Sequence, residues 1–147
     1  MFRRLLATTY TWIPVPLRLS LGAVFIAHGS QKVLGSFGGP GLAKFTSFPA
    51  PFPFMRPSWL WMSAAALSEL VGGVLVLLGF VTRLGAFLIA CVMLTAIVAV
   101  HRNAFFLPAG GMEYALSLFA ITIALLIGGG GAASIDLALT RGDRRRR

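Results

Sequence analysis

Two histidines, a lysine and two carboxylates stand out because their surroundings in the chain are almost entirely apolar. His28 and Lys32 are four residues apart and would share one face of a helix. Glu69 lies inside an apolar run, and His101 and Glu113 flank a short loop. Histidine and carboxylate side chains together can exchange protons near neutral pH. They could also bind a metal, although no Glu-x-x-His spacing typical of di-iron bundles is present.

The composition places these groups in a membrane rather than in water. Apolar residues make up 57% of the 147 and charged residues only 12%, whereas soluble domains are near one half and one quarter. Long apolar segments occupy about 14–34, 58–80, 84–101 and 113–131. We therefore predict an all-α integral membrane protein, a bundle of four transmembrane helices forming a single domain over 1–147.

The segments between and within these spans carry two packing signals. Residues 35–57 are rich in Gly, Pro and Phe, so most of this loop cannot be a regular helix, and we expect it to fold over the outer mouth of the bundle. Ala64, Ser68 and Gly72 repeat every four residues, which favours close helix packing.

The basic residues predict the orientation. Arg3, Arg4, Arg83, Arg141 and the terminal arginines fall on one side of four spans, and Lys44, Arg56 and Arg102 fall on the other. The positive-inside rule then places both termini and the basic tail 132–147 in the cytoplasm, next to anionic inner-leaflet lipids. Arg18 and Arg83 are expected to extend to this interface. No polar folded face that could bind nucleic acid is predicted.

In this orientation the polar groups gather in the outer half of the bundle. His28 would lie roughly 9 Å below the outer end of its helix. Glu69 must be protonated, paired or in a wet cavity, and Lys32 or His28 matches it best in depth. A structural ion pair explains Glu69 as well as a functional role does. His28 could equally be a buried, bonded histidine, and His101 and Glu113 could simply be solvated.

The single cysteine limits the redox chemistry. Cys91 has no partner for an internal disulfide, a CxxC pair or an all-cysteine metal site. No haem, flavin or iron–sulfur motif is visible, so any electrons must come from an organic cofactor, from His and carboxylate ligands, or from a partner.

The order of several short motifs resembles the DoxX family of small four-helix membrane proteins. The matching stretches, which together cover roughly 17–137, are Arg18-x-x-x-Gly22-x-x-Phe25-x-x-His28-Gly29-x-x-Lys32, Glu69-x-x-Gly72-Gly73, Leu77-Leu78-Gly79, Thr82-Arg83, His101, Gly110-Gly111-Met112-Glu113-Tyr114 and Ser134-Ile135-Asp136. The resemblance implies a four-span bundle in a bacterial-type inner membrane. The family is named for the membrane subunit of a quinone-reducing oxidoreductase, and other members resemble membrane partners of redox-defence enzymes.

Three functions are compatible with these observations. The first is a quinone-linked oxidoreductase subunit, in which His28 and Glu69 act as catalytic groups that hold quinone or relay protons, and Lys32, His101 and Glu113 line the outer route to the cofactor. The second is a non-catalytic accessory subunit that anchors other membrane or redox proteins through its small-residue stripes. The third, a small transporter or proton path, is disfavoured because the inner half of the bundle is so apolar.

Overall fold

The computed structural model describes residues 5–144, and over this range the chain forms helices and loops without a β-strand. The prediction of an all-helical fold is confirmed. The four long helical segments are α2 (Pro14–Val33), α4 (Ser58–Leu78), α5 (Thr82–Thr95, continued by a π-helical turn, Ala96–Val100) and α6 (Glu113–Gly128). Shorter helices are η1 (Ser36–Gly38), α3 (Gly41–Thr46), η3 (Leu107–Ala109) and α7 (Ile135–Arg144).

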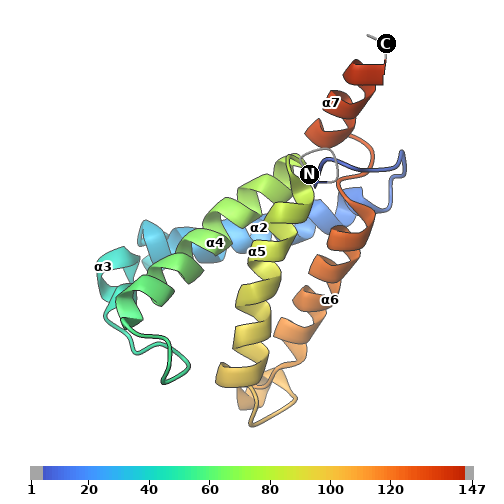
Figure 1. Cartoon of the computed structure of the whole chain (residues 1–147). Coiled ribbons are helices and arrows are strands. Elements are labelled where there is room, and N and C mark those ends of the chain that lie inside the picture. Colours follow the sequence, from blue (N-terminus) through green and yellow to red (C-terminus); the bar gives the residue numbers. More distant parts are fainter. Residues whose placement is uncertain (1–4, 145–147) are drawn as a thin grey trace.

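The long helices form two pairs that diverge like the arms of a V (Figure 1). One arm is α2 with α4, and the other is α5 with α6. The arms meet near the end where the termini lie, which we call the terminal end. They separate toward the end that carries α3 and the loop before α6, which we call the loop end.

Glycines set how closely these helices approach. A Cβ added to Gly29 of α2 would lie 2.5 Å from the backbone nitrogen of Leu70 in α4, and one added to Gly22 would lie 2.7 Å from Cβ of Leu77. Between α4 and α5, a Cβ added to Gly72 would lie 3.1 Å from the carbonyl oxygen of Gly85. Contacts this short allow backbone-to-backbone packing of the kind that holds membrane helices together.

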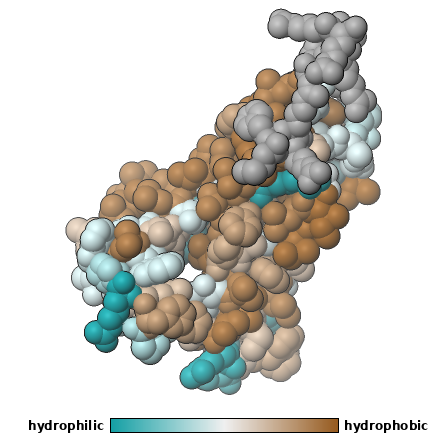
Figure 2. Space-filling model, viewed as in Figure 1, coloured by the Kyte–Doolittle hydropathy of each residue, from teal (hydrophilic) through white to brown (hydrophobic). Residues whose placement is uncertain are grey.

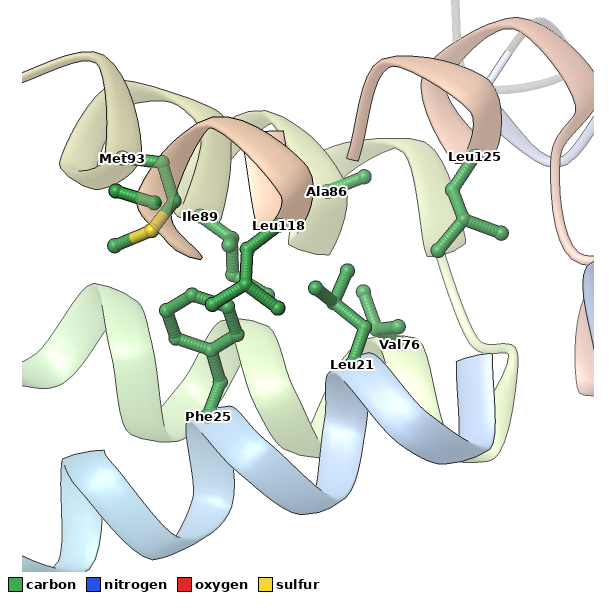
Figure 3. Packing of buried hydrophobic residues seen from close by; sticks show 9 residues of the cluster. Leu21, Phe25, Val76, Ala86, Ile89, Met93, Leu118 and Leu125 are labelled. Atoms are coloured by element: carbon green, nitrogen blue, oxygen red, sulfur yellow. The ribbon is translucent and has the colours of Figure 1, made fainter. Parts of the chain in front are cut away.

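The hydrophobic core lies where the two arms meet (Figure 3). It combines side chains from all four long helices: Leu21, Phe25, Val76, Ala86, Ile89, Met93, Ala115, Leu118 and Leu125. Leu21, Ile89 and Leu125 have no exposed surface. Close packing of these side chains, through their dispersion contacts, holds the two arms at a fixed angle.

The outer surface of the helices is apolar (Figure 2). α4 and the helix formed by α5 and its π-helical turn (Thr82–Val100) are each long and apolar enough to cross a membrane. Exposed apolar residues follow both of them, among them Leu67 and Val71 on α4 and Phe87 and Leu94 on α5. α2 and α6 do not meet the same criterion. The polar residues of α2 lower its mean hydropathy. The 16 residues of α6 give a length of about 24 Å, less than the roughly 30 Å of a hydrocarbon core.

The loop after α2 and the segment after α6 both pack against the bundle. The loop after α2 packs against the loop ends of α2 and α4 and contributes the short helix α3. The segment predicted as a basic tail is partly built into the bundle, because Ala132 and Ser134 before α7 and Asp136 in its first turn are buried. Arg3, Arg4 and Arg145 to Arg147 lie outside the described residues.

Candidate functional site

A cavity of about 640 Å³ lies between the two arms toward the loop end. Its walls come from α2, α3, α4, α5 and α6, and most are apolar side chains such as Phe25, Phe45 and Leu118. Figure 2 shows the hollow between the arms from one side. The volume falls within the range of pockets that hold small-molecule ligands.

The polar groups predicted from the sequence meet in this cavity. His28 and Lys32 come from α2, Glu69 from α4, and His101 from the end of the helix that contains α5. Glu113, the fifth predicted site residue, does not line the cavity. Within residues 5–144, no three His, Cys, Asp or Glu side chains lie close enough together to hold a metal ion.

Lys32 is the partner of Glu69. The lysine ammonium contacts both carboxylate oxygens and forms an ion pair between α2 and α4. Glu69 is almost fully buried, with 2% of its side chain exposed, whereas 25% of Lys32 is exposed. The ammonium also lies 5.3 Å from the centre of the Phe45 ring, so the pair reaches α3 as well.

His28 lies one turn before Lys32 on the same face of α2 and lines the cavity. Its side chain is exposed, and its imidazole has no hydrogen-bond or ion-pair partner within the described part of the chain. Both ring nitrogens are therefore free to bond a ligand. The interpretation of His28 as a buried, bonded histidine does not fit this position.

His101 and Glu113 have local bonds that shape the loop between them. Nδ1 of His101 lies 2.8 Å from the carbonyl oxygen of Gly110, and a carboxylate oxygen of Glu113 accepts a bond of 2.6 Å from the backbone nitrogen of Leu107. His101 still lines the cavity, while Glu113 stabilises the turn around η3.

The small-residue stripe on α4 divides into two parts. Gly72 packs against α5, where the arms meet. Ala64 and Ser68, further toward the loop end, line the cavity instead. The small side chains of Ala64 and Ser68 leave room for the cavity, whereas Gly72 allows close packing on α5.

A second polar cluster, which the sequence reasoning missed, lies at the terminal end. Asp136 is 1% exposed, and its carboxylate accepts bonds from the backbone nitrogens of Val81 (2.7 Å) and Thr82 (2.9 Å) and from the Thr82 hydroxyl (2.7 Å). Val81 has a φ of 44°, which is unfavourable for a β-branched residue, and the carboxylate stabilises this turn. The sequence signal for a helix start here was Ser134, because serine is a preferred N-cap residue. In the structure its hydroxyl accepts a hydrogen bond from the backbone nitrogen of Leu137, as expected at a helix N-terminus.

Arg18 completes this cluster and is not an interfacial anchor. Only 2% of it is exposed, and it donates to the carbonyl oxygens of Ala132 and Ala133, both at 3.1 Å, and of Leu77 at 3.4 Å. A side chain at Gly79, where φ is 64°, would overlap Nη1 of Arg18. The expectation for Arg18 fails because backbone carbonyls at the helix ends replace lipid headgroups as its partners. Arg83 donates to the carbonyl oxygen of Ile127 at 2.9 Å.

The apolar helices and the cavity define a helical membrane protein with a ligand-sized site between two helix pairs. The chain belongs to the DoxX family, since the family model described as DoxX matches residues 13–102. A relative from Bacillus subtilis (strain 168), named "Putative oxidoreductase CatD", is 32% identical over 115 residues, which cover 74% of this chain and 75% of the relative. No solved structure matches the chain.

Proposed function

We propose that this chain is the membrane subunit of a quinone-linked oxidoreductase complex and that the cavity binds the quinone head. The observation that carries the proposal is that His28, the Lys32–Glu69 pair and His101 all line one largely apolar cavity. The relative named as an oxidoreductase supports the same class of function.

The chemistry of a quinone fits these groups. Its ring is flat and apolar, and its two carbonyl oxygens accept hydrogen bonds. Lys32 has three N–H groups and gives two of them to Glu69, so one remains for a carbonyl oxygen. His28 can donate to the second carbonyl, and Phe25 and Phe45 supply apolar walls for the ring.

Reduction of a quinone to a quinol takes up two electrons and two protons. We assign the protons to His28 and to the Lys32–Glu69 pair, which line the cavity and can be reprotonated from its mouth. The electrons come from a redox group of a partner subunit. Glu113 takes no part in this scheme, because its carboxylate is bonded to the loop outside the cavity.

We further propose that all four long helices cross a bacterial-type inner membrane, with the terminal end in the cytoplasm and the loop end outside. The distribution of basic residues, with more of them at the terminal end, favours this orientation. The basic C-terminal residues would then meet anionic lipids. In this orientation the cavity opens in the outer half of the bilayer.

The proposal is tested by quinone binding to the purified protein in a mild detergent. Bound quinone is extracted and measured by mass spectrometry, and affinity is measured with ubiquinone-10. We expect His28→Ala, which loses a hydrogen bond to the quinone, and Glu69→Gln, which loses the ion pair that positions Lys32, each to weaken binding by about tenfold or more. Glu113→Gln, the same chemical change outside the cavity, should leave binding unchanged. Wild-type protein that binds no quinone would contradict the proposal.

A second candidate function is that of an accessory subunit without chemistry of its own. The Lys32–Glu69 pair favours it, because an ion pair between α2 and α4 accounts for a buried carboxylate without any reaction. The same purification separates the two. A stable partner protein at equal stoichiometry with no quinone, and with Glu69→Gln lowering only the yield of assembled protein, would establish the accessory role.

A further inference from the structure

The cavity does not only open at the loop end; it also reaches the side of the bundle. Exposed residues on α4 recur at Leu60, Ala64, Leu67 and Val71, and this stripe faces away from the core. On α5 the matching exposed stripe is Leu84, Phe87, Cys91 and Leu94. Ala64 and Cys91 belong to these stripes and line the cavity as well. The cavity therefore meets the lipid-facing surface between α4 and α5.

The divergence of the two helices produces this side opening. Gly72 and Gly85 hold α4 and α5 together near the terminal end. Toward the loop end the arms separate (Figure 1), and the residues of α4 and α5 that line the cavity there include the small side chains Ala64, Ala65 and Thr95. We call the gap bounded by Ala64, Ala65, Cys91 and Thr95 the side window.

We infer that the side window holds the alkyl or isoprenoid chain of a membrane-dissolved ligand whose head lies in the cavity. This inference rests on the proposed function and adds the class of substrate, a quinone with a long chain, and the residue that selects for the chain, Ala64. A quinone that enters from water would need no opening on the lipid-facing surface.

The polarity of the cavity supports this occupant over others. Its charged and imidazole groups are His28 and Lys32 on α2, Glu69 paired with Lys32, and His101, whereas the residues of the side window, Ala64, Ala65, Cys91 and Thr95, carry no charge. The Thr95 hydroxyl already donates to the carbonyl oxygen of Cys91 at 3.0 Å, so its hydrogen is not available to a ligand. A ligand with a polar head and an apolar chain matches both regions at once.

The test compares two probes with the same head, ubiquinone-10 and the chain-free 2,3-dimethoxy-5-methyl-1,4-benzoquinone, bound to protein in lipid nanodiscs. Ala64→Trp places a large ring in the side window. It should weaken binding of ubiquinone-10 about tenfold more than binding of the chain-free probe, because the ring takes the space of the chain. Leu67→Trp is the matched control, because Leu67 lies on the same exposed stripe but does not line the cavity.

Each other outcome overturns the inference in a different way. Equal weakening of both probes would mean that Ala64 faces the head rather than the chain. No change in either probe would exclude the side window as the chain's location. Wild-type protein that binds neither probe would contradict the proposed function itself. Efficient oxidative cross-linking of Cys91 between two copies in membranes would show that a second copy, not a chain, covers the side window.

Discussion

Lys32 and Glu69 form an ion pair between α2 and α4 in which the carboxylate is buried and the ammonium is partly exposed to the cavity. The two helices also pack closely at Gly29 and Gly73, both on the terminal-end side of this pair. The pair therefore links the packing of α2 on α4 to the polar part of the cavity wall, which also includes His28.

Removing the lysine should cost more than removing the pair. Lys32→Met leaves the Glu69 carboxylate buried without a partner, and we expect a loss of stability of about 3 kcal/mol, seen as a lower midpoint of thermal unfolding in detergent. Lys44→Met, at an exposed position on α3, is the control and should have little effect. The double variant Lys32→Met/Glu69→Leu should recover much of the loss. Equal midpoints for the two lysine variants would mean that the pair is not formed.

The carboxylate of Asp136 should hold the C-terminal segment to the turn between α4 and α5. Asp136→Asn places an amide where three donors converge, and we expect a loss of about 2 kcal/mol or more together with faster hydrogen exchange in residues 132–140. Thr140→Val is a suitable control, since the Thr140 hydroxyl bonds only within α7. Unchanged exchange in Asp136→Asn would show that this segment is held by other contacts.

The close approach of α2 and α4 predicts opposite results for two helical glycines. Gly29→Ala should strongly reduce the yield of folded protein, because its methyl group would meet the backbone of Leu70. Gly128→Ala, at a helical position with nothing within 4 Å of the added carbon, should be neutral or slightly stabilising. Yield and the midpoint of thermal unfolding measure both. Similar behaviour of the two variants would contradict the packing of α2 on α4.

Cys91 provides a direct report on the cavity, since it is the only cysteine of the chain and lines the cavity wall. Bound ubiquinone-10 should slow alkylation of Cys91 by N-ethylmaleimide, measured as the modified fraction by mass spectrometry. Leu94→Cys in a Cys91→Ala background supplies the comparison, because Leu94 lies on the same exposed stripe outside the cavity. Protection at both positions would indicate a general effect of quinone in the bilayer rather than binding in the cavity.

Much of the helical framework follows from the sequence. The apolar segments predict the positions of α2, α4, α5 and α6 to within a few residues, because long runs without charges are helical wherever backbone groups lack water. Lys32 was one of two cations that matched Glu69 in depth, and the i, i+4 spacing with His28 placed both on one face. These results depend on periodicity and local chemistry, which the sequence displays directly.

The tertiary structure alone decided three other features. The divergence of the two arms turns Ala64 and Ser68 from packing residues into cavity walls, and no periodicity reports the angle between helices. Arg18 and Asp136 looked like an interfacial anchor and a tail residue because their partners, Ala132 and Val81, are distant in sequence. Glu113 was grouped with the site by proximity in the chain, but its backbone partner at Leu107 takes it out of the cavity. Such pairings depend on where separate segments meet, which packing fixes and composition does not.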